Sequence, residues 1–232
     1  MASNYHVAGT ELWMCGYNSF GQLGDGTTSH KSSPVQTVVN GHNWKQVAVG
    51  DNATAAIKTD GTLWMCGYDA YGQLGDNTIV NKSSPVQTVA GGTTWKYVAV
   101  GGNHTAAIKT DGRLWTWGLN TYGQLGDNTL VHKSSPVQTV AGGTNWYQVS
   151  AGDGNTAAIK TDGTLWAWGT NTFGQLGDNT QLRRSSPVQT IAGGTNWKYV
   201  AGGPNHNTAI KTDGTLWVCG YIARGELGVN NL

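Results

Sequence analysis

Hydrophobic and polar positions alternate over short stretches of this chain, and four such stretches recur together. In one copy the predicted strands cover residues 85–89, 95–100, 105–109 and 114–117. Short alternating runs bounded by glycine clusters are typical of half-buried β-strands. Asp111-Gly112 lies between the last two stretches and predicts a tight hairpin, because Gly adopts positive φ at low cost.

The pattern repeats at a fixed distance of 51 residues, which is the spacing between successive Leu-Trp pairs. These pairs start at residues 12, 63, 114, 165 and 216. Gly-Gln-Leu-Gly starts at 21, 72, 123 and 174, and Ser-Ser-Pro-Val-Gln-Thr starts at 32, 83, 134 and 185. A period of this size indicates a solenoid, a propeller or an array of repeats.

Four antiparallel strands followed by a long link predict one blade of a β-propeller, so the expected fold class is all-β. A β-solenoid is the alternative, but its coils are usually shorter and lack regular hairpins. We expect a single propeller domain over 1–232, with a spare hairpin at 1–16 and a tail at 220–232. The four full blades are predicted at 32–66, 83–117, 134–168 and 185–219.

Composition supports this class and excludes several partners. The chain has 35 Gly, 11 Trp and 9 Tyr but only 12% charged residues, which suits strands, tight turns and an aromatic core. The net charge is +1 and the densest basic spot is Arg183-Arg184, so nucleic-acid binding is not expected. No apolar run approaches the ~20 residues of a membrane span. Met1 leads into polar residues, so no signal peptide is visible and the compartment stays undetermined.

No catalytic constellation is visible in the sequence. Glu occurs only at Glu11 and Glu226, and the six His show no metal-ligand spacing. The chain is therefore predicted to be no enzyme and to hold no metal or cofactor. Most Asp residues occupy two repeated turn positions, where we expect them to cap their own turns. These are Asp60, Asp111, Asp162 and Asp213 before the hairpin Gly, and Asp25, Asp76, Asp127 and Asp178 after Gly-Gln-Leu-Gly.

The three Cys residues share one repeat position with two Trp residues. Cys15, Cys66 and Cys219 stand where the other copies carry Trp117 and Trp168. Exchange between Cys and Trp predicts a buried apolar slot rather than a disulfide framework.

The repeat resembles that of the regulator of chromosome condensation family. The residues that carry the likeness are the run from Trp95 through Gly101, His104-Thr105, Asp111-Gly112, Leu114-Trp115, Trp117-Gly118, Gly123-Gln-Leu-Gly126 and Pro136. The resemblance implies a propeller, most often of seven blades. Members include an exchange factor for a small GTPase, a plant light receptor and a bacterial β-lactamase inhibitor, so the family transmits no single function. Exchange activity is not expected, because no insertion breaks the period.

Variation among the copies points to one face of the disc. Successive turns of an antiparallel blade alternate between its two faces, so the nearly constant Asp-Gly hairpins and Gly-Gly-Thr loops share one face. The variable connections share the other, and loops on a rigid scaffold are common binding sites. The candidate binding residues there are Tyr17, His30, Tyr68, Asn103, His104, His132, Arg183, Arg184, His206 and Arg224. The recurring aromatics Phe20, Tyr71, Tyr122 and Phe173 are expected to pack under their own loops.

Three functions remain open at this stage. The first is a non-enzymatic scaffold that binds a protein through the variable face; the others are a carbohydrate-binding propeller and a self-assembling repeat without a ligand. Seven repeats of this length would exceed 232 residues. The chain can therefore close a small ring alone, share a larger ring with a second chain, or be part of a longer protein. Open strand edges would favour a homo-oligomer.

Overall fold

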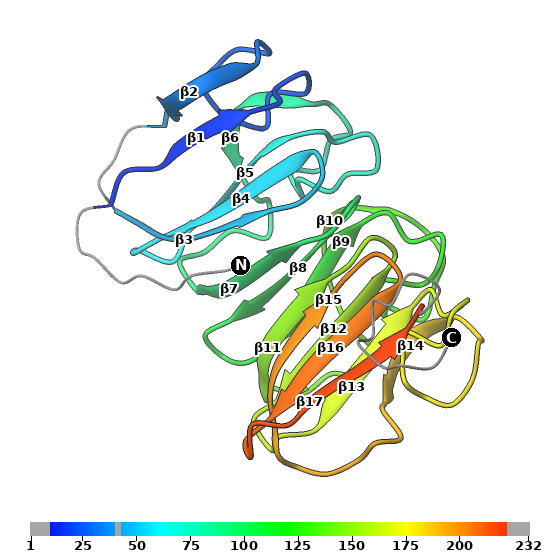
Figure 1. The fold of residues 1–232 in the computed structure, drawn as a ribbon. Coiled ribbons are helices and arrows are strands. Elements are labelled where there is room, and N and C mark those ends of the chain that lie inside the picture. Colours follow the sequence, from blue (N-terminus) through cyan, green and yellow to red (C-terminus); the bar gives the residue numbers. More distant parts are fainter. Residues whose placement is uncertain (1–9, 40–42, 222–232) are drawn as a thin grey trace.

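The structure is a computed structural model that describes residues 10–39 and 43–221. Its regular elements are all strands, which form successive antiparallel sheets (Figure 1). The first two sheets contain β1 (Trp13–Gly16) and β2 (Lys31–Gln36), then β3 (Trp44–Val49), β4 (Ala53–Lys58), β5 (Leu63–Gly67) and β6 (Lys82–Gln87). The third and fourth contain β7 (Trp95–Val100), β8 (His104–Lys109), β9 (Leu114–Gly118) and β10 (Lys133–Gln138), then β11 (Trp146–Ala151), β12 (Asn155–Lys160), β13 (Leu165–Gly169) and β14 (Arg184–Gln189). The last contains β15 (Trp197–Gly202), β16 (His206–Lys211) and β17 (Leu216–Gly220).

The predicted β class is confirmed, but the sheets are offset by one strand from the predicted blades. Each Ser-Ser-Pro strand pairs with the Leu-Trp strand that precedes it, so β6 completes the sheet of β3, β4 and β5. The long link folds back instead of crossing to the next sheet. A residue at its start, Gly67, has a φ of 113°, and a Cβ there would meet the Asn52 carbonyl oxygen at 2.3 Å. The crossing is made by the short Gly-Gly-Thr loop.

The core lies between neighbouring sheets. Small residues such as Ala107 on the second strands allow close approach, and large side chains such as Trp95 and Trp117 fill the junctions. The Trp117 indole donates a hydrogen bond of 2.8 Å to the Gln73 carbonyl of the preceding link, which satisfies its buried polar atom. Trp168 and Gln124 repeat this contact one junction later.

The described sheets form an open arc in which the first and last sheets are not hydrogen-bonded to each other. Both ends expose residues whose counterparts are buried in the inner sheets. At the first end Trp13 is 53% exposed, whereas its counterparts Trp64, Trp115 and Trp166 are half-buried; at the last end Leu216 is 65% exposed, whereas Leu114 is fully buried. Closure of a small ring by one chain is therefore not seen among these residues. Most of the predicted hairpin and tail, at 1–9 and 222–232, lies outside the described part.

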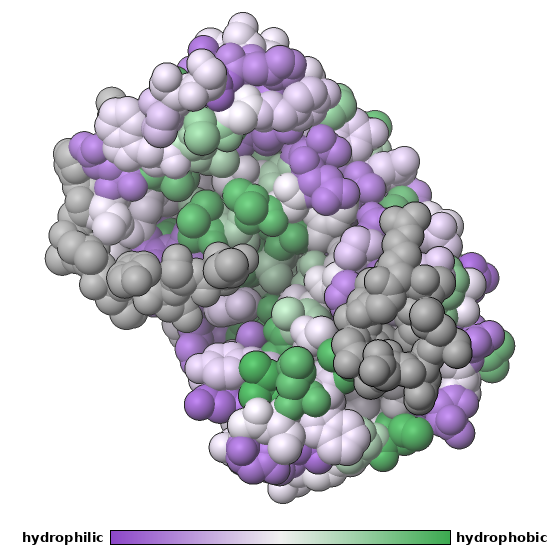
Figure 2. Space-filling view, viewed as in Figure 1, coloured by the Kyte–Doolittle hydropathy of each residue, from purple (hydrophilic) through white to green (hydrophobic). Residues whose placement is uncertain are grey.

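A hollow runs along the inner strands, with a volume of about 460 Å³. It is lined mainly by β3, β7 and β11. Hydrophobic residues gather in the hollowed middle of the surface in this view (Figure 2). Among the described residues, no helix is long and apolar enough to cross a membrane.

Candidate binding surface

The connections of the sheets separate into two faces, as the alternation of turns predicts. The link after β5 meets the β3–β4 turn, since the Tyr68 amide donates to the Asn52 carbonyl at 2.8 Å. The hairpin after β4 meets the Gly-Gly-Thr loop instead, where the Trp95 amide donates to the Gly61 carbonyl at 3.0 Å. We call the first surface the link face and the second the hairpin face. The link face comprises links 17–31, 68–82, 119–133 and 170–184 with turns 50–52, 101–103, 152–154 and 203–205.

Each link is organised around one buried side chain. In the first link this is Asn18, whose Nδ2 donates to Asp25 Oδ1 and to the carbonyls of Thr27 and Ser29, each at 3.1 Å. Its Oδ1 accepts the Leu23 amide at 2.9 Å. Asn120 and Asn171 make equivalent bonds in the third and fourth links. This amide fixes the path of the link and so holds its exposed residues in place.

The second link carries Asp69 at the same buried position. Its Oδ1 accepts the Leu74 amide at 2.8 Å, as Asn does elsewhere. Its Oδ2 stands where the other links have the amide nitrogen, and it accepts a hydrogen bond of 3.4 Å from Thr78 Oγ1. Burial raises the pKa of Asp69 to about 7, and the nearby charge of Asp76 adds to the increase. When protonated, the Asp69 carboxyl also carries an O–H donor at the position where the other links have an amide N–H.

The repeated aspartates cap their turns as predicted. Asp25 and Asp76 accept the amides of Thr27 and Thr78, and their other oxygens pair with Lys31 and Lys82. The Asp60 carboxylate similarly accepts the Thr62 amide at 2.9 Å in the hairpin. Backbone and side-chain bonds from Thr62 hold the pKa of Asp60 below its ordinary value.

Two of the predicted histidines accept a backbone hydrogen bond within their own link and still expose their side chains to solvent. His30 Nδ1 accepts the Asn18 amide at 3.0 Å, and His132 Nδ1 accepts the Asn120 amide at 3.0 Å. Asn81 makes the same contact in the second link. Because an acceptor Nδ1 is unprotonated, the proton of each neutral ring is on Nε2. Both histidines are exposed on the link face.

Aromatic rings join one link to the next. Tyr17 stacks on His30 with ring centroids 4.8 Å apart, and Phe20 contacts Tyr68 of the second link at 4.9 Å. Tyr71 contacts His132 of the third link at 5.4 Å. Phe20 and Tyr71 contact Tyr17 and Tyr68 of their own links, as expected, and each ring also bridges to the following repeat. We call the rings of Tyr17, Phe20, His30, Tyr68, Tyr71 and His132 the aromatic row.

Other predicted site residues behave differently. His104 is a correction: it is fully buried, and its Nε2 lies 2.8 Å from Thr156 Oγ1 of the next sheet. It opens β8 with its side chain turned inward, and burial lowers its pKa to about 4. Arg184 is half-buried and pairs with Asp178 at 2.7 Å, so it supports the link. Arg183 is exposed and donates to the Thr121 carbonyl at 3.4 Å.

Three further candidates complete the set. Asn103 is half-buried at the end of its turn, and His206 is half-buried as the first residue of β16. Arg224 lies outside the described residues. Sequence reasoning missed the buried organisers Asn18, Asp69 and their equivalents, although a polar residue two positions after the Gly of the first four Leu-Trp-x-x-Gly runs was a visible signal.

The shared Cys and Trp position is a slot between sheets, as predicted. The Cys66 thiol is buried and lies 3.4 Å from the Gln22 carbonyl, which matches the Trp117 contact. Burial raises the pKa of the Cys66 thiol to about 12, so this group is inert at neutral pH. Cys15 is exposed, because no described link precedes its strand. No cluster of three or more potential metal ligands occurs among the described residues.

Repeated four-stranded antiparallel sheets, each closed by a Gly-Gln-Leu-Gly link before its last strand, define a β-propeller repeat protein. The RCC1-like domain family matches residues 5–231, and the chain belongs to this family. The ultraviolet-B receptor UVR8 of Arabidopsis thaliana is 31% identical over 98% of this chain and 52% of its own length.

Solved structures agree on the fold. Human WBSCR16 matches with a TM-score of 0.78 and 26% identity over 93% of this chain and 58% of its own. Prp20p from Saccharomyces cerevisiae matches with a TM-score of 0.81 and 22% identity over 95% and 55%. That structure was reported with its binding properties to Gsp1p and histones. The chain therefore spans about half the length of these relatives.

Proposed function

We propose that this chain is a non-enzymatic scaffold that binds a protein partner through its link face. The aromatic row is the observation that carries the proposal. Tyr17 is 53% exposed, and the row continues across three consecutive links on a framework of internally bonded loops. Tyrosine supplies a large, rigid contact area with a polar tip, and it is enriched where proteins bind each other.

Two further observations support a protein rather than a glycan. Prp20p, which shares the fold, is described as binding Gsp1p and histones. Arg183 stands exposed at the far end of the link face from Tyr17 and adds a cation that carboxylates of a partner can pair with. The surface thus offers aromatic anchors at one end and a positive charge at the other.

The test is the affinity of a purified partner, first captured from a native extract, for variants of the link face. Tyr17→Ala/Tyr68→Ala and Arg183→Ala should each weaken binding at least tenfold, about 1.4 kcal/mol. Arg184 is not used, because its removal would also release Asp178 and loosen the fourth link.

Matched control variants lie away from the link face. Arg113→Ala removes an exposed arginine on the hairpin face, where it pairs with Asp111. Tyr147→Ala removes a half-exposed tyrosine on β11. Both should leave affinity unchanged. Equal loss from link-face and control variants would contradict the proposal, and binding to a glycan array without a protein partner would replace it.

A further inference from the structure

The hairpin face gathers positive charge. It comprises residues 10–11, the hairpins 59–62, 110–113, 161–164 and 212–215, the described parts of the crossing loops 37–43, 88–94, 139–145 and 190–196, and the strand residues within two positions of them. Its cations are Lys45, Lys58, Lys96, Lys109, Arg113, Lys160, Lys198 and Lys211, and its carboxylates are Glu11, Asp60, Asp111, Asp162 and Asp213. The link face has the opposite balance, with more aspartates than cations. A chain whose net charge is only +1 therefore carries its excess positive charge on one face.

The two faces also differ in how their cations are paired. On the link face each long cation at the end of a link forms an ion pair with an aspartate of the same link; these are Lys31, Lys82, Lys133 and Arg184. On the hairpin face Arg113 pairs with Asp111 at 2.8 Å. None of the seven lysines of that face forms an ion pair within the part of the chain that the structure describes. Asp60 instead accepts hydrogen bonds from the amide and hydroxyl of Thr62 in its own hairpin.

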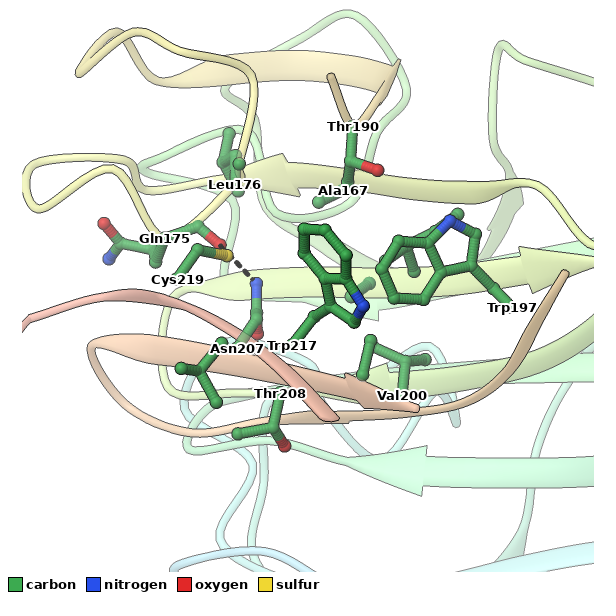
Figure 3. Close-up of a pocket in the computed structure, with 15 residues that line it drawn as sticks. Ala167, Gln175, Leu176, Thr190, Trp197, Val200, Asn207, Thr208, Trp217 and Cys219 are labelled. Atoms are coloured by element: carbon green, nitrogen blue, oxygen red, sulfur yellow. Dashed lines mark hydrogen bonds between the residues drawn. The ribbon is translucent and has the colours of Figure 1, made fainter. Parts of the chain in front are cut away.

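Four of these lysines are held in place by tryptophan rings. The Nζ of Lys109 lies 4.8 Å from the ring centroid of Trp95 and 5.0 Å from that of Trp115. In the last sheet Lys211 lies over Trp197 and Trp217, whose neighbouring rings are seen in Figure 3 with centroids 5.9 Å apart. Lys58 and Lys160 make the same contacts. A cation–π contact keeps the positive charge and restricts the side chain, so less conformational entropy is lost when a ligand binds.

A second set of lysines lies beside the stacked ones. Lys96 and Lys198 are exposed at the second positions of β7 and β15. The residue before each is bonded to the hairpin of the preceding sheet, since the Trp95 and Trp197 amides donate to the Gly61 and Gly163 carbonyls at 3.0 Å. Lys45 occupies the same position in β3. Unpaired ammonium groups therefore extend along the hairpin face from sheet to sheet.

We propose that the hairpin face binds an acidic polypeptide segment, separately from the protein partner of the link face. Carboxylates of such a segment would pair with lysines of successive sheets, where no aspartate of the chain now pairs with them. The aspartates between the lysines disfavour a duplex, because its phosphates place one charge about every 1.7 Å of axis. A polypeptide can instead place its carboxylates opposite the lysines alone, and complementary charge of this kind gives specificity and fast association.

A synthetic peptide and two matched pairs of replacements test this proposal. Fluorescent octaglutamate should bind the wild-type protein saturably by anisotropy at low salt, and octaglutamine should not bind. Lys96→Gln/Lys198→Gln should weaken binding about tenfold, because each replacement removes an exposed, unpaired charge without disturbing a contact of the fold. Lys82→Gln/Lys133→Gln removes the same charge from the link face and should leave binding nearly unchanged.

Three outcomes would overturn the proposal. Absence of octaglutamate binding would exclude an acidic ligand, and equal losses from the two pairs of replacements would show that net charge acts without regard to the face. Tighter binding of a single-stranded DNA oligonucleotide with the same charge would replace the polypeptide by a nucleic acid. The pair Tyr17→Ala/Tyr68→Ala should leave octaglutamate binding unchanged, so failure of the link-face proposal and failure of this one are distinguishable.

Discussion

At the scale of single residues, Asp69 sets the second link apart from the others. The three other links hold an amide at this buried position, which donates to carbonyl and carboxylate oxygens. A carboxylate offers no proton for those acceptors, and burial raises the pKa of Asp69 to about 7. The second link is therefore the part of the link face whose order depends on pH.

The replacement Asp69→Asn should stabilise the protein, and by more at high pH. The folded-state pKa of Asp69 is above its unfolded value, so the wild type loses stability as pH rises from about 4 to about 7. Above that range the loss is complete. Denaturant unfolding at pH 4 and pH 8 should show a gain for the variant that is larger at pH 8 by about 1–3 kcal/mol.

The third link supplies the matched control for this prediction. Asn120 makes the same bonds as Asn18, so Asn120→Asp should introduce a pH dependence similar to that of Asp69. A gain for Asp69→Asn that is equal at pH 4 and pH 8 would contradict the assignment of the proton to Asp69.

At the scale of elements, the junctions between sheets share one geometry, and the equivalent position in each junction holds either Trp or Cys. Trp168 donates its indole N–H to the Gln124 carbonyl at 2.9 Å, and Cys219 lies 3.2 Å from the Gln175 carbonyl. A cavity of about 70 Å³ remains beside Cys219 in the last slot, against about 10 Å³ beside Cys66 in the first. The last junction is therefore less completely filled than the first.

Cys219→Trp should stabilise the last junction by filling its cavity, by about 0.5–2 kcal/mol. The indole would donate to the Gln175 carbonyl, as Trp168 does to Gln124. Cys66→Trp is the control, because its slot retains only about 10 Å³ and overpacking should make that change neutral or destabilising. Thermal unfolding of both variants measures the change in stability that each replacement causes. Equal stabilisation by the two replacements would show that cavity size does not determine this change.

Much of the element level could be predicted from the sequence. The alternation in residues 95–117 and the Asp111-Gly112 turn predicted three strands of the β7–β10 sheet and the hairpin between β8 and β9. The partner of each Ser-Ser-Pro strand could not be read from order alone, because a link that folds back and one that crosses over share a length. That choice depends on Gly67 and on the buried Asn or Asp, whose bonds become visible only in three dimensions.

The candidate site was predicted less completely. Variation among copies located the link face and the exposed Tyr17, His30, His132 and Arg183. The same variation also placed His104 on the link face, and that placement was wrong. His104 follows a variable turn, but it is the first residue of β8 and its side chain points inward. Contacts between links, such as Phe20 with Tyr68, arise from stacking of sheets and have no signature within one repeat.

At the scale of the whole molecule, the described sheets form an arc with a constant hairpin face and a variable link face. The chain spans about half the length of UVR8, WBSCR16 and Prp20p. The aromatic row lies across the first three links of the link face.

Hydrogen–deuterium exchange with the captured partner bound tests the central claim, that the link face is the binding surface. The account predicts slower exchange in the links 17–31, 68–82 and 119–133 on binding, with unchanged exchange in the hairpins around Gly61 and Gly112. Protection confined to the hairpins or to the edge of β17, with the links unchanged, would contradict it.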